Sequence, residues 1–183
     1  MKSLLAGCGN SRERQIAPGE WDELVTLDIS PSCHPDIIWD LNNLPLPFND
    51  NEFDELLFFQ TLEHIGQQGD YKTFFAQFIE FWRILKPGGM FYAACPKWNS
   101  IWAWSDPGHK RIISEAMLTY LCQNEYEKQV GVTAITDYRE IYKADFEIIK
   151  LFDLGREDWG FQLKAINKRR VHSCSMQQNK FVL

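Results

Sequence analysis

Three short segments carry residues whose types and spacing could hold a nucleoside-like ligand. Gly7-Cys8-Gly9 directly follows an apolar run, and glycines at such a turn let a ligand approach the backbone closely. Asp28 stands about 20 residues further on, where a carboxylate can accept hydrogen bonds from ribose hydroxyls. Asp40-Leu41 ends a later run. Asp40 could accept from an adenine amino group, or could equally cap the asparagine turn after it. Together these segments predict an adenosine-containing ligand.

Two histidines could act as bases. His64 comes just after an apolar run, although packing of its loop is the interpretation we favour for it. His109 lies in the segment Asp-Pro-Gly-His, where Asp106 could fix its tautomer as a carboxylate partner does. Bracing of a loop by Asp106 and His109 explains the same residues equally well. We therefore carry His64, Asp106 and His109 forward as catalytic candidates.

The stretch between residues 96 and 111 is irregular and rich in tryptophan. Trp98, Trp102 and Trp104 could wall an apolar or aromatic acceptor, although such residues more often cover the edge of a core. Arg111 at the end of the stretch is a further candidate for contact with substrate.

These residues must be positioned by alternating strands and helices. We expect strands over Ser3–Ala6, Leu24–Asp28, Asp36–Trp39, Asp54–Phe59 and Met90–Cys95, then an antiparallel pair over Phe146–Phe152 and Trp159–Ile166 with a turn around Gly155. We expect helices over Ser11–Ile16, Tyr71–Leu85, Ser114–Glu125 and Tyr138–Lys143. This order predicts a doubly wound α/β sheet, whose ligands lie at the carboxyl ends of the strands. One domain is expected over residues 1–167, with a tail over 168–183 that we expect to be mobile.

The sequence also resembles a known family. The stretches DLNNLPLPFNDNEFDE, FDELLFFQTLEHI and EFWRILKPGGMFYAACP are similar to class I S-adenosylmethionine-dependent methyltransferases. The segment around His109 resembles one in small members of bacterial and phage type. The resemblance implies a Rossmann-like sheet of seven strands, mostly parallel, with the last strand antiparallel.

The resemblance also implies roles for particular residues. Gly7-Cys8-Gly9 would lie beneath the methionine part of S-adenosylmethionine, and Asp28 would bind its ribose. Asp40 and Leu41 would bracket the adenine, and Gln60 and Thr61 would offer backbone groups near the sulfonium. Two positions depart from the family pattern, because Leu5 replaces a frequent acid and Asn10-Ser11 replaces a third glycine.

Composition narrows the function classes. The net charge is -6 and the isoelectric point is near 5.2, which disfavours non-specific binding of nucleic acid. The five cysteines form no Cys-x-x-Cys pair, and we find neither a zinc motif nor the acidic cluster of metal-dependent catechol-type enzymes. No signal peptide or membrane span is evident, so we expect a cytoplasmic protein without a bound metal.

The sequence therefore predicts a methyltransferase that uses S-adenosylmethionine, releases S-adenosylhomocysteine, and acts on a hydroxyl or amine of a small molecule. A protein or nucleic-acid acceptor stays open, and so does the oligomeric state. One alternative is a non-catalytic module that binds the cofactor as a partner or sensor. A weaker alternative is an NAD-dependent oxidoreductase, whose fingerprint requires a third glycine at the position of Arg12.

Overall fold

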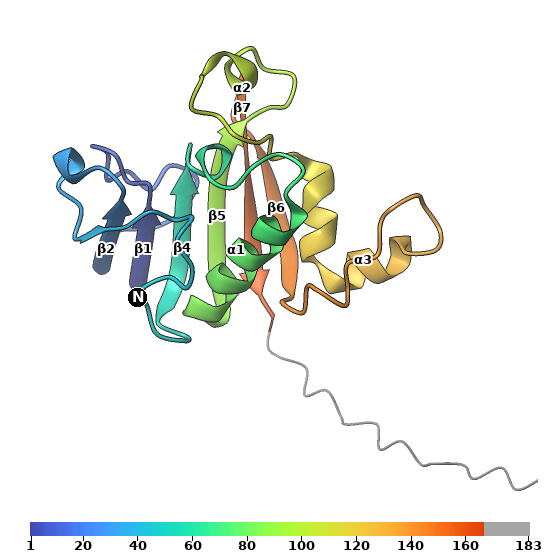
Figure 1. Ribbon diagram of the computed structural model, residues 1–183. Helices are drawn as coiled ribbons and strands as arrows, with labels where there is room; N and C mark the ends of the chain where they lie inside the picture. Colours follow the sequence, from blue (N-terminus) through green and yellow to red (C-terminus); the bar gives the residue numbers. More distant parts are fainter. Residues whose placement is uncertain (167–183) are drawn as a thin grey trace, which may run out of the picture.

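A single sheet organises the chain. The computed structural model describes residues 1–166, and every element below lies in that range. Its seven strands follow the order β3-β2-β1-β4-β5-β7-β6 (Figure 1). The strand bounds are β1 Lys2–Ala6, β2 Glu23–Asp28, β3 Ile37–Ile38, β4 Phe53–Phe59, β5 Leu85–Pro96, β6 Phe146–Asp153 and β7 Asp158–Ala165. The expected tail over residues 168–183 lies outside the described residues.

The sheet is mixed in the way the resemblance implied. Strands β3, β2, β1, β4 and β5 are parallel neighbours, whereas β7 runs antiparallel to both β5 and β6. The predicted Rossmann-like α/β sheet with an antiparallel last strand is therefore confirmed. Strand order reverses between β1 and β4, and ligands of such sheets bind beside this reversal. The glycine turn follows β1, and the Gln60-Thr61 segment follows β4.

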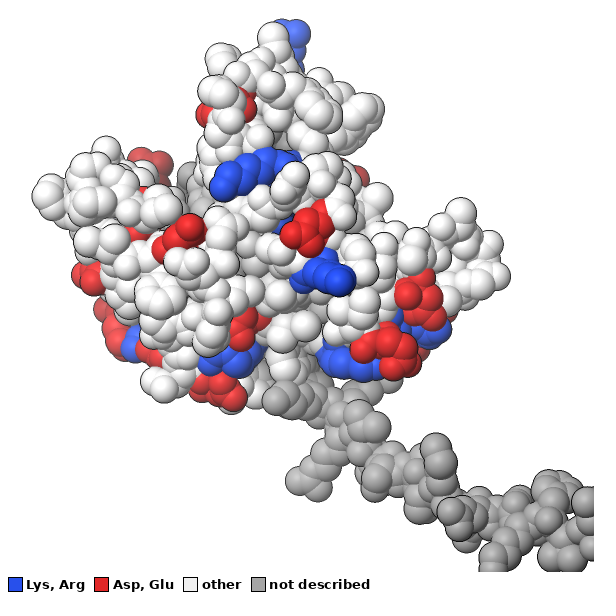
Figure 2. All heavy atoms as spheres, viewed as in Figure 1, with Lys and Arg blue, Asp and Glu red and all other residues white. Residues whose placement is uncertain are grey.

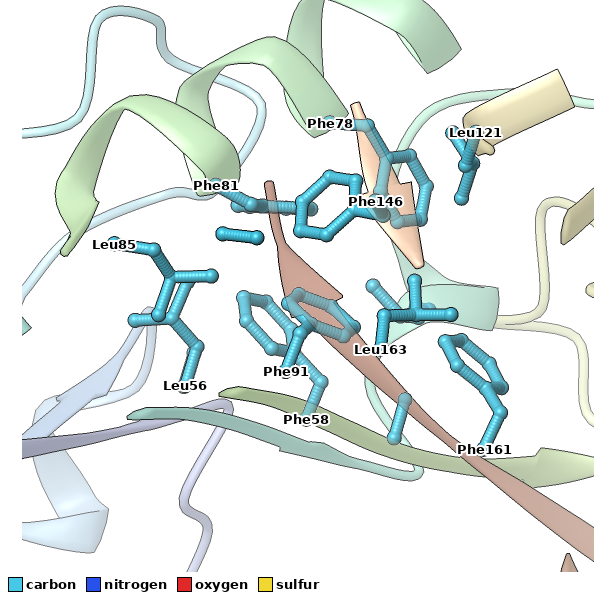
Figure 3. Close-up of a cluster of buried hydrophobic side chains, with 14 of the residues drawn as sticks. Leu56, Phe58, Phe78, Phe81, Leu85, Phe91, Leu121, Phe146, Phe161 and Leu163 are labelled. Atoms are coloured by element: carbon cyan, nitrogen blue, oxygen red, sulfur yellow. The ribbon is translucent and has the colours of Figure 1, made fainter. Parts of the chain in front are cut away.

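Apolar runs become strands because both of their faces are covered. In β4, the residues from Leu56 to Phe58 are completely buried. Phe58 stacks on Phe91 of β5, with ring centroids 5.0 Å apart, and Phe91 in turn stacks on Phe161 of β7 at 6.1 Å. Figure 3 shows these rings on the strands below Phe78 and Phe81. This aromatic layer ties three neighbouring strands to one helix.

That helix is α1, which spans Tyr71–Ile84. Asp70 caps it by accepting hydrogen bonds from the amide and the hydroxyl of Thr73 at 3.1 and 2.6 Å. Its aromatic residues at three- and four-residue spacing face the sheet, as the periodicity predicted. The chain enters β5 at Leu85, earlier than the predicted start at Met90, because Leu85 still pairs with Phe53 of β4.

The expected helix over Ser11–Ile16 is wrong, because the segment forms turns and irregular structure. The Arg14 guanidinium lies 2.6 Å from the buried Glu55 carboxylate of β4 and also donates to the Pro18 carbonyl at 3.0 Å. The Trp21 indole donates to the Arg12 carbonyl at 2.7 Å. These bonds hold the segment flat against the sheet, and they use a carbonyl that a helix would need.

Three other expectations need correction. The expected strand over Asp36–Trp39 is only the two-residue β3. The expected helix over Ser114–Glu125 divides into a 3-10 helix, η3 (Glu115–Leu121), and a short helix, α3 (Gln123–Gln129). The expected helix over Tyr138–Lys143 is a single turn closed by two amides that donate to the Tyr138 carbonyl. The remaining elements are η1 Pro31–Cys33, η2 Leu62–His64 and α2 Trp102–Ser105.

The two faces of the sheet are covered differently. Helix α1 and η3 contribute to the larger buried cluster, which contains Phe78 and Leu118. The second cluster is smaller and includes Leu57, Ala17 and the flanking Trp21, so the irregular segment after β1 closes that face. Within the described part of the chain, no helix has both the length and the apolar character to cross a lipid bilayer.

Candidate functional site

The glycine turn is fastened to the end of β2. The amides of Gly7 and Cys8 both donate to the Leu27 carbonyl, at 2.8 and 3.2 Å. The Gly9 amide donates to one carboxylate oxygen of Asp28 at 2.9 Å, and the Ser30 amide donates to the other at 2.8 Å. Asp28 is therefore held beside Gly9, as their spacing in the sequence suggested. Each carboxylate oxygen keeps a further lone pair for a ligand.

Gly7 and Gly9 have left-handed backbones but different surroundings. Their φ angles are 65° and 48°, which favour glycine. A Cβ on Gly7 would lie 2.4 Å from two side-chain atoms of Thr61, whereas a Cβ on Gly9 would meet no atom within 4 Å. Gly7 thus lets β1 and β4 approach each other, and Gly9 faces open space that a ligand could fill.

Thr61 and Gln60 lie at the end of β4. The Thr61 hydroxyl donates to the Phe59 carbonyl at 3.0 Å and lies 3.2 Å from the Ala6 carbonyl. Gln60 has a left-handed φ of 51°, and its exposed side chain donates to Asp158 at 3.1 Å. The structure therefore places Thr61 against the glycine turn at the strand-order reversal, whereas the contacts of Gln60 are with Ala94 of β5 and Asp158 of β7.

Asp40 and Leu41 have structural contacts of their own. One Asp40 oxygen accepts from the backbone amide and the side-chain amide of Asn42, at 2.9 and 2.8 Å. This is the turn cap that the sequence offered as the alternative to adenine binding. Leu41 is buried in the larger core. Contact of either residue with adenine stays a prediction.

His64 and His109 come together although the chain separates them widely. Their rings meet edge to face, with centroids 4.6 Å apart. His64 Nδ1 lies 3.2 Å from the Gly108 carbonyl, and His109 Nδ1 lies 3.3 Å from the Ala103 carbonyl. Because a carbonyl can only accept, these contacts place a proton on each Nδ1, so in the neutral ring the lone pair lies on Nε2.

Of the two roles that the sequence left open for Asp106, the structure favours bracing of the loop over orientation of His109. Its carboxylate lies 3.9 Å from His109 Nε2, which is too long for a hydrogen bond. Its other oxygen accepts from the Gly108 amide at 2.6 Å. Asp106 therefore braces the loop, and the Ala103 carbonyl orients the imidazole.

Glu63 lies beside both histidines and was not among the residues predicted from the sequence. It is 2% exposed, and burial raises the pKa of its carboxyl to about 7, partly opposed by its own backbone amide and by the Cys95 thiol. The Glu63 carbonyl accepts from the amides of Lys110 and Arg111, at 2.7 and 3.3 Å, which docks the His109 loop onto η2. The signal was an acid between Leu62 and His64, shortly after the apolar run that ends at Phe59.

Arg111 was expected at the substrate, but it is only 4% exposed. Its Nε donates to the Leu62 carbonyl at 2.9 Å, and its guanidinium lies over the Phe74 ring. Burial lowers its pKa to about 10. Arg111, Glu63 and His109 line one small, closely packed cavity that has no room for a water molecule. Arg111 also lines a second pocket, whose other walls include Tyr71, Phe75 and Tyr138.

The tryptophan-rich loop projects beyond the carboxyl ends of the strands, around α2 (Figure 1). Its surface in Figure 2 is largely uncharged. Trp98 and Trp104 line a groove of about 930 Å³, together with Met117 and Trp159. Trp102 is 60% exposed and does not line this groove. Two of the three tryptophans therefore line one groove, and contact of any of them with an acceptor stays a prediction.

Comparisons with known proteins agree with this geometry. Residues 4–93 match the family described as a methyltransferase domain. A probable S-adenosylmethionine-dependent methyltransferase of Mycolicibacterium smegmatis is 35% identical over 145 residues, which are 70% of this chain and 54% of the relative. The chain thus spans about half the length of that relative.

Solved structures share the fold. An S-adenosylmethionine-dependent methyltransferase of Archaeoglobus fulgidus superposes with a TM-score of 0.58 at 14% identity, covering 89% of this chain and 85% of that one. A Burkholderia thailandensis 1,6-didemethyltoxoflavin-N1-methyltransferase, solved with its heterocycle and S-adenosylhomocysteine, superposes at 0.55 and 14% identity over 90% and 71%. This chain belongs to the class I S-adenosylmethionine-dependent methyltransferases.

Membership of this family implies S-adenosylmethionine as the cofactor, the group for which the Mycolicibacterium relative is named. Two observations fit that group: the open space at Gly9 and the fixed carboxylate of Asp28 beside it. The missing helix after β1 does not disturb the fit, because S-adenosylmethionine has no phosphate that a helix N-terminus would bind. Leu5, which replaces a frequent acid, is 3% exposed in the core and offers no charge to the cofactor's amino group.

Proposed function

We propose that the chain transfers the methyl group of S-adenosylmethionine to a hydroxyl or amine of a small molecule that lies in the Trp98–Trp104 groove. The groove itself is the observation that carries this proposal. Its volume of about 930 Å³ is in the upper part of the range for small-molecule sites. Its walls combine apolar and aromatic residues with polar and charged ones that could orient an acceptor, namely Gln68, Lys97, Asn99, Ser114 and Glu115.

The groove lies next to the histidine pair. Ile112 lines both the groove and the small cavity that Glu63 and His109 share. An acceptor held between Trp98 and Trp104 would therefore be close to the carboxyl end of β4, where we expect backbone groups of Gln60 and Thr61 to contact the cofactor. The Burkholderia protein named above binds a small heterocycle on the same fold, which supports a small-molecule acceptor here.

Within this proposal, the residues of the chain chiefly position the reactants. The cofactor supplies an activated methyl group on a good leaving group, so no covalent enzyme intermediate is needed. Alignment of donor and acceptor then lowers the activation barrier. In this proposal the glycine turn positions the cofactor, and the aromatic groove positions the acceptor. His109 Nε2 would accept the proton of the acceptor hydroxyl or amine, because the Ala103 carbonyl holds Nδ1 in its protonated form.

The first test is calorimetric titration of the purified chain with S-adenosylmethionine and S-adenosylhomocysteine. Asp28→Asn removes the charge that we assign to the ribose, and it should weaken both ligands by about 10- to 100-fold, the effect of one charge-assisted hydrogen bond. Asp22→Asn is the matched control, since Asp22 is exposed and pairs only with the N-terminal amine in the described structure. Its affinity should equal that of the wild type.

A panel of small hydroxyl and amine acceptors would then be screened for release of S-adenosylhomocysteine. Turnover of at least one acceptor, reduced by His109→Ala, supports the proposed activity. Cofactor binding without turnover of small molecules, proteins or nucleic acids would instead favour the non-catalytic module. Absence of cofactor binding would refute the proposed roles of Gly9 and Asp28.

A further inference from the structure

We propose that Glu63, His64 and His109 form a binding site for one divalent transition-metal ion such as Zn²⁺. One candidate ligand atom from each of these residues lies within 4.8 Å of the other two. Glu63 and His64 come from η2 after β4, and His109 comes from the loop after α2. The set differs from the acidic cluster sought in the sequence, because it joins one carboxylate to two imidazoles.

The two imidazoles are oriented as metal ligands usually are. A histidine that binds a metal commonly donates its other ring N–H to a carbonyl or carboxylate, which fixes the tautomer. Here Gly108 and Ala103 provide those carbonyls to His64 and His109, at 3.2 and 3.3 Å from Nδ1. In the neutral rings both Nε2 atoms therefore carry the lone pair, and the edge-to-face packing keeps the rings together. His109 Nε2 can either bind a metal ion or accept a proton from the acceptor, so the two roles exclude each other at any one time.

The burial of Glu63 supports the metal site independently of the two histidines. The Glu63 side chain is almost completely buried, and among the described residues only its own backbone amide and the weakly donating Cys95 thiol interact with the carboxylate, neither in good hydrogen-bond geometry. Burial of a carboxylate with so few donors is costly, so the position calls for a compensating group. Arg111 lies across the same small cavity without forming an ion pair with it, and both terminal nitrogens of its guanidinium also lack acceptors.

The ligand types select the metal. Two imidazoles and one carboxylate are the set of many catalytic zinc sites, and of other first-row metals with open coordination positions. Mg²⁺ and Ca²⁺ prefer sites made only of oxygen. Ligand atoms around one ion are about 3 Å apart, so the three side chains would close by about 1 to 2 Å, a change within reach of small χ rotations.

Arg111 sets a limit on this site, because its positive charge opposes a cation. The site would hold one carboxylate, two neutral imidazoles and one guanidinium, so the metal would be bound without excess negative charge. We therefore expect moderate affinity. The charge of Glu63 should be essential, because no other carboxylate belongs to the three-residue ligand set.

The test uses the full chain, stripped with a chelator and kept free of cofactor and acceptor. Titration with Co²⁺, a coloured substitute for Zn²⁺, should give one equivalent of visible d–d absorption that Zn²⁺ then displaces. Glu63→Gln, His64→Ala and His109→Ala should each weaken binding by more than about 100-fold, because loss of a ligand exceeds the effect of an outer-shell change. Circular dichroism of each variant shows whether it is folded.

The chain's other two histidines provide matched controls. His34→Asn suits the left-handed backbone at that position, where φ is 48°. His172→Asn removes the fourth histidine of the sequence. Both variants should keep wild-type Co²⁺ binding. The proposal is overturned if the wild type binds no stoichiometric Co²⁺, or if binding survives loss of Glu63 or of His109 in folded protein. Either result leaves the methyltransferase assignment untouched, because no cofactor is present.

Discussion

Gly7 and Gly9 stand two positions apart in one turn, yet their replacement by alanine should have different consequences. In Gly7→Ala the new Cβ would lie 2.4 Å from Cγ2 and Oγ1 of Thr61, so neighbouring atoms must move. The left-handed backbone costs about 1–2 kcal/mol for alanine, and the overpacking adds about 1–3 kcal/mol. We expect Gly7→Ala to lower the free energy of unfolding by about 2–5 kcal/mol. In Gly9→Ala only the backbone contribution of about 1–2 kcal/mol remains.

A second substitution separates the steric contribution from the backbone contribution. Thr61→Ala alone should cost about 1–2 kcal/mol, because it removes a buried hydroxyl that donates to the Phe59 carbonyl. In Gly7→Ala/Thr61→Ala the clashing atoms are gone, although Thr61 Cβ would still lie 3.0 Å away. The double variant should therefore be more stable than the sum of the single variants predicts, by about 1–3 kcal/mol.

Urea unfolding, followed by fluorescence of the seven tryptophans, measures these free energies without ligand. Calorimetric titration with S-adenosylhomocysteine then completes the comparison. Gly9→Ala should lose ligand affinity while staying folded, because its Cβ enters the space that we assign to the cofactor. Additive effects of Gly7→Ala and Thr61→Ala, or full ligand affinity in Gly9→Ala, would refute this account of the turn.

Three further predictions concern other parts of the molecule. Trp104→Ala should raise the KM for the acceptor by about 10-fold, as expected for the loss of one aromatic wall of the groove. Trp102→Ala should leave this KM unchanged, and steady-state kinetics with an identified acceptor measures both effects. Burial alone would raise the pKa of Glu80, but the Arg83 guanidinium and the Leu46 amide hold it below its usual value. This carboxylate therefore stabilises the fold at pH values above its unfolded pKa near 4.5, and the stabilisation is lost as the pH falls through its lower folded pKa. The free energies of unfolding of wild type and Glu80→Gln should differ by about 1–3 kcal/mol at pH 7 and become equal in acid. Phe91→Ala should cost about 3–5 kcal/mol in urea unfolding, because its ring lies between those of Phe58 and Phe161.

The sheet could be predicted from the sequence because each strand and helix is encoded by the pattern of neighbouring residues. An apolar run such as DELLFF has to be covered on both faces, and the helix periodicity after Asp70 identifies the element that covers one of them. The contact between the glycine turn and Asp28 could be predicted equally well, since their spacing in the sequence already implied that they meet. The structure joins them by a single hydrogen bond of 2.9 Å.

The errors come from contacts between residues far apart in the chain. Nothing near Ser11 shows that Arg14 will pair with Glu55 of β4, and this pair holds the segment in a non-helical conformation. The approach of His64 to His109 has the same origin, because amides of the later loop donate to the Glu63 carbonyl. An acid inside LEH was visible in the sequence, but the packing was needed to show that Glu63 is buried with few hydrogen-bond donors.

The two sides of the candidate site are therefore built differently. On the cofactor side, Gly7, Thr61 and Asp28 are fixed by the pairing of β1 with its two neighbouring strands, so changes there should affect stability and binding together. On the acceptor side, Trp98, Trp104 and His109 belong to one loop after β5, docked onto η2 mainly through backbone bonds. Side chains of such a loop can change without disturbing the sheet. We therefore expect acceptor specificity to reside in the loop, and cofactor specificity in the strand ends.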